Sequence, residues 1–109
     1  MATTFKNKII TEVGIAPVVA IATDANTRST IIGISLANIT DGIIYANVLV
    51  KSDDSVIGYF LKNVIVPPNT SLRALSAGEK LILAPENQLL IAADQNEGLD
   101  AIISYVDIV

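Results

Sequence analysis

Apolar and polar residues alternate along most of the chain, and turn-forming residues interrupt the alternation at short intervals. Side chains of a strand point alternately to its two faces, so this pattern predicts half-buried strands. Isoleucine and valine greatly outnumber leucine, and such β-branched residues suit a pleated sheet. The predicted strands are residues 5–13, 29–38, 43–51, 56–66, 71–75, 80–84, 88–93 and 100–108, with a short apolar piece at 18–22.

The clearest pair of strands surrounds Asp41–Gly42, a dipeptide typical of tight hairpin turns. The preceding strand places Ile32, Ile34 and Leu36 on one face, and the following strand is also aliphatic on one face. We therefore expect the two strands to form an antiparallel hairpin with their aliphatic faces toward the core. Gly33 lies inside this pattern, where glycine often marks a bulge or a close approach of another backbone.

The elements together predict an all-β fold, an antiparallel β-sandwich of about eight strands with Ig-like or jelly-roll wiring. A chain of 109 residues fits one domain. We expect residues 1–28 to supply an N-terminal arm and the first strand or strands of that domain, and residues 29–109 to form the sandwich body. For residues 72–84 a helix is the alternative, because leucine, alanine and lysine tolerate one; the strand interpretation instead places a turn at 77–79.

Composition adds a constraint that the pattern alone does not give. Apolar residues make up 51% of the chain and charged residues 17%, with a mean hydropathy of +0.56, whereas roughly a quarter of residues are charged in ordinary globular proteins. A domain this small hides a smaller share of its surface than a large one. We therefore expect part of the apolar set to lie on a face that another subunit covers. The competing explanation is that alanine, which needs no partner when exposed, inflates the count.

The net charge of −4 and the scattered positions of the 7 lysine and arginine residues argue against a nucleic-acid surface, which needs concentrated positive charge. The same balance gives no attraction to anionic membranes. No apolar run is long enough for a membrane helix, and the first residues do not lead into the apolar segment of a signal peptide. Synthesis in the cytoplasm is therefore expected.

The chain contains neither histidine nor cysteine. The commonest general base, the commonest metal ligand and all thiol chemistry are therefore missing. One loop carries Asp94, Asn96 and Asp100 at alternate positions, as calcium loops do, but Gly98 comes one position too early and Tyr105 stands where an EF-hand has its closing glutamate. We predict no catalytic, cofactor-binding or metal-binding residue, and no enzyme activity.

The residues that we expect at a subunit contact are Phe5, Ile9, Ile10, Tyr45 and Tyr105. The first three belong to the N-terminal arm, and the two tyrosines fall on the less aliphatic faces of their strands. Aromatic rings dominate cores and interfaces. Exposed rings on a rigid sheet also bind sugars, so a carbohydrate-binding adhesion module, with the two tyrosines as its platform, is the alternative from another class.

Four segments of the second half follow one another in an order that resembles small virion structural proteins of tailed phages. These segments are Lys62–Leu72 with its proline turn, Gly78–Leu83, Gln88–Ala93 and Leu99–Ile108. The region around Asp41–Gly42 also looks like the opening hairpin of that family, so the resemblance covers roughly residues 29–109.

The resemblance implies a β-sandwich that oligomerises on the capsid, neck, tail or fibre of a virion. A capsid decoration (cement) role is favoured over a tail, neck or fibre position. The expected partners are further copies of the chain, for instance in a trimer, and a major capsid or tail protein, with no nucleic acid and no membrane. The expected location is the virion, after synthesis in the host cytoplasm. The family has no catalytic residues to transfer.

Overall fold

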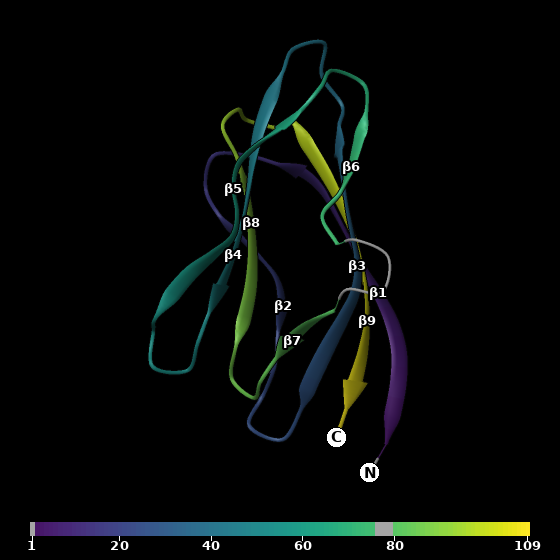
Figure 1. Cartoon of the computed structure of the whole chain (residues 1–109), viewed down its shortest axis with the longest axis vertical. Helices are drawn as coiled ribbons and strands as arrows, with labels where there is room; N and C mark the ends of the chain where they lie inside the picture. Colours follow the sequence, from purple (N-terminus) through teal and green to yellow (C-terminus); the bar gives the residue numbers. More distant parts are fainter. Residues whose placement is uncertain (1, 76–79) are drawn as a thin grey trace.

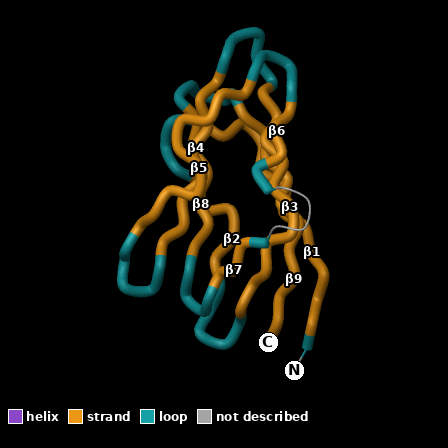
Figure 2. Tube along the Cα trace, in the orientation of Figure 1, coloured by secondary structure: helices purple, strands orange, loops and turns teal. Residues whose placement is uncertain are grey.

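The computed structural model describes residues 2–75 and 80–109, which form two antiparallel sheets packed face to face (Figure 1). The molecule measures 45 × 27 × 20 Å. These two ranges contain strands and loops but no helix (Figure 2), hence none that is long and apolar enough to cross a membrane. The strands are β1 (Thr3–Val13), β2 (Val18–Ala22), β3 (Arg28–Asn38), β4 (Ile44–Lys51), β5 (Ile57–Val66), β6 (Ser71–Arg73), β7 (Leu81–Leu83), β8 (Gln88–Ala93) and β9 (Leu99–Ile108).

The strands are wired as a jelly roll. One sheet, termed sheet A, has the order β1-β9-β3-β6, with β7 also paired to β3; the other, sheet B, has the order β2-β8-β4-β5. The chain crosses between the sheets after β1, β2, β3, β5, β7 and β8, and only the β4–β5 hairpin stays in sheet B. This crossing pattern defines a double-sheet jelly roll. The predicted antiparallel sandwich is confirmed, in the jelly-roll form.

The core consists of the facing sides of the two sheets. The alternation predicted for the strand at 43–51 is confirmed, because Ile44, Ala46 and Val48 of β4 are fully buried. Burial of one large aliphatic side chain contributes about 1.5–3 kcal/mol. The largest fully buried side chains come from both sheets and are Ile31, Leu36, Ile44, Leu83, Leu89, Ile91, Leu99 and Ile103.

The hairpin predicted at Asp41–Gly42 is wrong, since β3 lies in sheet A, β4 lies in sheet B and the two do not pair. The segment is a corner between the sheets, held by the buried side chain of Asn38. Its Nδ2 donates to the carbonyl oxygens of Gly42 at 2.7 Å and Val66 at 2.9 Å. Its Oδ1 accepts from the Thr40 amide at 2.8 Å. The aliphatic faces of β3 and β4 then meet across the core rather than side by side.

A bulge in β3 changes which residues face the core. Ile31 pairs with Tyr105 and Gly33 pairs with Ser104, so Ile32 is an extra residue without a partner. Of the two roles expected for Gly33, a bulge or a close backbone approach, the structure shows a bulge directly beside it. The placement of Ile32 on the core face is wrong, because a bulge moves the following residues to the opposite side of the sheet; Ile31 is buried and Ile32 is exposed.

The segment 72–84 contains strand rather than helix where it is described. β6 pairs with β3 through Leu72 and Leu36, and β7 pairs with β3 through Leu81 and Ile31. The two short strands therefore extend sheet A on the same side of β3. The turn predicted at 77–79 lies outside the described residues.

The first two strands lie in different sheets. β1 pairs with β9 in sheet A, and β2 pairs with β8 in sheet B, so each forms an edge of its sheet. The amide of Val109 donates to the carbonyl of Ala2 at 2.9 Å, and the reverse bond measures 3.2 Å. The two ends of the described chain therefore lie side by side (Figure 1).

Candidate functional site

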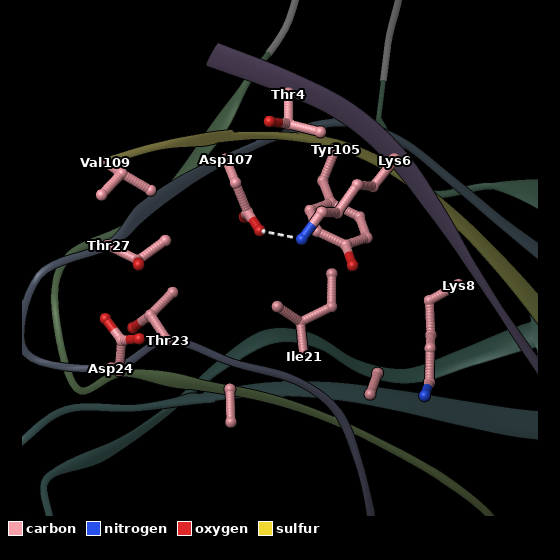
Figure 3. Close-up of a pocket in the computed structure, with 12 residues that line it drawn as sticks. Thr4, Lys6, Lys8, Ile21, Thr23, Asp24, Thr27, Tyr105, Asp107 and Val109 are labelled. Carbon is pink, nitrogen blue, oxygen red and sulfur yellow. Dashed lines mark hydrogen bonds and ion pairs between the residues drawn. The ribbon is translucent and has the colours of Figure 1, made fainter. Parts of the chain in front are cut away.

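Strand β1 carries two large apolar side chains, with Asn7 between them, on the face that points away from its own core. Phe5 and Ile9 are 77% and 61% exposed on the outer side of sheet A. Lys6 and Lys8 project from the opposite side, into the space between the sheets (Figure 3). A strand that only closed its own sandwich would place apolar residues inward and polar ones outward. The reversed pattern indicates that another surface covers the outer side.

Apolar side chains from several strands continue this surface, which we term face A. Its exposed large residues are Phe5, Ile9, Ile32, Ile82 and Ile102. Directly paired residues point to the same side of a sheet. One row across β1, β9, β3 and β7 is Phe5–Val106–Thr30–Ile82. A second row begins with the pair Ile9–Ile102. The second row continues to Ser35 and Arg73, and Asn7 and Ser104 lie between the two rows. Face A therefore carries two groups of apolar side chains with polar residues between and beside them.

The outer side of sheet B, termed face B, is also apolar. One row across β2, β8, β4 and β5 is Val19–Leu90–Leu49–Tyr59. Tyr45 pairs with Ile65 further along the same side, and both side chains are exposed. The ammonium of Lys62 lies 5.1 Å from the centre of the Tyr59 ring. The molecule thus carries an apolar area on each of its two broad outer sides.

The fold divides the five residues expected at a subunit contact among three places. Phe5 and Ile9 lie on face A, and Tyr45 lies on face B. Ile10 and Tyr105 are partly buried and pack against the core. Because the tyrosines occupy different sheets and Tyr105 faces inward, their rings do not share one platform.

Sequence reasoning did not single out Ile32, Ile82 and Ile102 as contact residues. The alternation of the last strand separates Ile102 from Ile103 but does not say which of the two faces the core. The bulge at Gly33 was the available signal for Ile32, since a bulge reverses alternation. Ile82 could be found only from its pairing with Thr30.

A crevice of about 390 Å³ opens between the sheets, beside the two ends of the described chain (Figure 3). Sheet A contributes side chains of β1 and β9, and the facing wall comes from β2 and the loop that follows it. The functional groups that line it are the side chains of Lys6, Lys8, Thr23, Asp24, Tyr105 and Asp107. The crevice is polar because the first half of β1 extends beyond the apolar core.

An ion pair is fixed on the sheet A wall of this crevice. Lys6 Nζ lies 3.0 Å from Asp107 Oδ2, and the buried hydroxyl of Ser29 donates to Asp107 Oδ1. The hydrogen bond and the negative charge of Asp107 raise the pKa of Lys6 above its ordinary value of 10.5. Since the Lys6 side chain is half exposed, the pair adds little stability. The bond from Ser29 does hold the Asp107 carboxylate in place.

The loop with partial likeness to a calcium site uses its carboxylates to bind the backbone. Asp94 Oδ1 accepts from the amide of Tyr45 at 3.0 Å. Asp100 Oδ1 accepts from the amide of Glu12 at 2.9 Å. Within residues 2–75 and 80–109, no group of three or more acidic side chains is placed to hold a metal ion. These two aspartates therefore attach loops and strand ends to neighbouring strands.

Two loop aspartates predict how stability responds to acid. Hydrogen bonds from the Thr27 side chain and the Asn26 amide lower the pKa of Asp24, and one from the Ser52 hydroxyl lowers that of Asp54. Their stabilising effect is complete above the ordinary value of 3.8 and is lost as the pH falls through the lowered values. We expect Asp24→Asn to flatten the acid limb of a plot of melting temperature against pH. Asp54→Asn should flatten the limb in the same way, and a limb that neither substitution changes would contradict the prediction.

The chain matches no known family model and no curated protein by sequence. Its fold is similar to that of a chain from the disulfide-linked pili that form Bacillus endospore appendages, with a TM-score of 0.56 and 7% identity over 96% of this chain and 86% of that one. A chain from the T13 IBDV viral particle aligns with a TM-score of 0.49 and 9% identity, over 96% of this chain and 35% of that one. The first likeness shows the fold alone, which the strand order identifies as a jelly roll.

Proposed function

We propose that the chain is a non-enzymatic structural subunit that assembles with copies of itself through faces A and B. The observation that carries the proposal is the apolar row that crosses four strands on each outer side. Burial of apolar surface is the dominant favourable term in most protein association. Large exposed apolar patches are typical of contact sites in soluble proteins.

A structural role is preferred to an enzymatic one on chemical grounds. The chain lacks histidine and cysteine, so nucleophilic or acid–base catalysis would depend on carboxylates, lysine or tyrosine alone. The most prominent surfaces are apolar and nearly flat, whereas substrates bind in concave sites with converging polar groups. Faces A and B fit the packing of another protein surface better than they fit a small substrate.

Within this class we infer a virion subunit, with a capsid decoration role ahead of a tail, neck or fibre position. Support comes from the resemblance of residues 29–109 to small virion proteins of tailed phages and from the jelly-roll fold. The partners would be further copies and a major capsid or tail protein. The similar pili are disulfide-linked, but this chain has no cysteine, so its own contacts would be non-covalent.

The proposal is tested by sedimentation velocity over a wide range of protein concentration. We expect species larger than the monomer, and we expect Phe5→Lys combined with Ile82→Lys to weaken association at least thirtyfold, which is about 2 kcal/mol and typical of residues central to an interface. Both side chains are highly exposed, so the variant should fold normally.

The matched control is Ile15→Lys combined with Val56→Lys, which also adds two positive charges, at exposed residues of the β1–β2 and β4–β5 loops that belong to neither row. It should associate like the unmodified chain. A chain that stays monomeric at the highest concentration would refute self-assembly. Equal weakening by the control would show that charge, rather than face A, governs association.

A further inference from the structure

The crevice between β1, β9 and β2 is separate from both apolar faces. Lys6 and Lys8 enter it from the side of β1 opposite Phe5 and Ile9. It therefore stays open when face A is covered, and it has no part in the proposed assembly. Its volume of about 390 Å³ is within the range of small-molecule sites, about 300–1,000 Å³.

Hydrogen-bond donors and acceptors are both held in place in this crevice. Asp107 accepts a hydrogen bond from the Ser29 hydroxyl at Oδ1 and one from the Lys6 ammonium at Oδ2. An ammonium group has three N–H groups, so Lys6 keeps two for other partners. The amide of Asn26 donates to Asp24 Oδ1 at 2.9 Å, which fixes that carboxylate on the facing wall. In Figure 3 the Tyr105 hydroxyl points into the space between the walls, and Lys8 extends across it.

The charges in the crevice balance. Two ammonium groups, from Lys6 and Lys8, accompany two carboxylates, from Asp24 and Asp107. The carboxylates would repel a phosphate or another small anion, and the ammonium groups would repel a cation. Binding of neither kind of ion is therefore favoured. A neutral ligand whose groups both donate and accept hydrogen bonds can bond to side chains of either sign.

We propose that this crevice binds a saccharide unit of one or two rings. Each sugar hydroxyl can donate to a carboxylate and accept from an ammonium group, and charge-assisted hydrogen bonds of this kind are the strong ones. The ring and hydroxyl of Tyr105 provide an apolar wall with a polar tip, which suits the C–H face and the hydroxyl edge of a sugar. The buried Ser29 hydroxyl holds the Asp107 carboxylate before the ligand arrives, which lowers the entropic cost of binding.

The test is a titration followed by two-dimensional amide NMR, with glucose, galactose, N-acetylglucosamine, cellobiose and chitobiose as probes. At least one probe should shift amide signals of residues 4–8, 20–27 and 105–109 in a saturable manner. Tyr105→Phe removes only a hydroxyl, and Lys8→Met removes only the charge from a side chain of similar length. Each should raise the Kd about tenfold, the effect expected for one lost hydrogen bond to a charged or polar group.

The matched controls are Tyr59→Phe and Lys62→Met, which make the same changes on β5, outside the crevice. They should leave the Kd unchanged, and the spectra report directly whether each variant is folded. The proposal fails if none of the five sugars shifts those residues, or if the crevice variants bind as tightly as the controls. Shifts with inorganic phosphate or an acidic peptide, but with no sugar, would also overturn it. The crevice lies on the side of β1 opposite face A, so either result is independent of self-assembly.

Discussion

Asn38→Ala is expected to lower the free energy of unfolding by about 2–4 kcal/mol, because it leaves several corner groups without partners. Asn38 is 3% exposed. Its side-chain NH2 donates to the carbonyls of Gly42 and Val66, and its side-chain oxygen accepts from the Thr40 amide. The Val66 contact is buried, so water cannot easily replace it. Domains of this size are stable by only about 5–15 kcal/mol. Urea denaturation of the variant and the unmodified chain measures the difference.

The control for this prediction is Asn47→Ala. Asn47 Oδ1 also accepts an amide hydrogen bond, from Asn63 at 2.9 Å, but in an exposed position. Water can take over that bond, so the loss should stay below about 1 kcal/mol. Similar losses of unfolding free energy at the two asparagines would show that the buried hydrogen bonds of Asn38 stabilise the fold no more than an exposed one does. Asn38→Asp should resemble Asn38→Ala at neutral pH, because a carboxylate cannot donate to the two carbonyls.

Gly98→Ala is expected to cost about 1–3 kcal/mol, the usual range for overpacking a core. A Cβ at this position would overlap with Cδ1 of Ile44 and lie 3.7 Å from Cγ2 of Thr40. Ile44 is completely buried, so its terminal methyl group has little room to move. The amide of Gly98 also donates to the carbonyl of Val13 at 3.2 Å, which holds the backbone at this place. Thermal unfolding and urea denaturation both report the loss.

A second substitution separates this overlap from other effects of losing a glycine. Ile44→Val removes the overlapping Cδ1 atom and should cost about 0.5–1.5 kcal/mol alone. The loss of unfolding free energy in the double variant should be smaller than the sum of the losses in Gly98→Ala and Ile44→Val, by about 1 kcal/mol or more. The reason is that the two side chains are in contact. Gly42→Ala, where a Cβ would meet nothing within 4 Å, is the matched control and should change stability by less than about 0.5 kcal/mol. Strict additivity would disprove the overlap.

The positions of the strands could be predicted from the sequence, but their partners could not. Alternation of apolar and polar residues shows which side chains of one strand share a face. It predicted the bounds of β3, β4 and β9 to within one residue. Pairing depends on contacts between distant residues, such as Lys6 and Asp107, which are 101 positions apart. The corner at Asp41–Gly42 illustrates this, because its dipeptide suits a hairpin equally well. What decides the outcome is the bond from Asn38 to Val66.

The candidate site was predictable in character rather than in detail. The excess of apolar residues indicated covered surfaces, and the outer sides of both sheets are apolar. Phe5, Ile9 and Tyr45 lie on those sides, whereas Tyr105 faces inward. An alternating strand presents two similar faces when both carry isoleucine and valine, as Ile102 and Ile103 do. Only the pairing with β1 and β3 determines which of them packs into the core.

Faces A and B lie on opposite sides of the sandwich, so the proposed assembly would give each copy two contact sides. A subunit with a single interface can bind only one neighbour. A block with two unlike adhesive sides can be joined at each of them, and such head-to-tail contacts close into a ring or continue as an open filament, depending on the rotation between successive copies. The angle at which one copy meets the next would therefore set the size of any array that this chain builds.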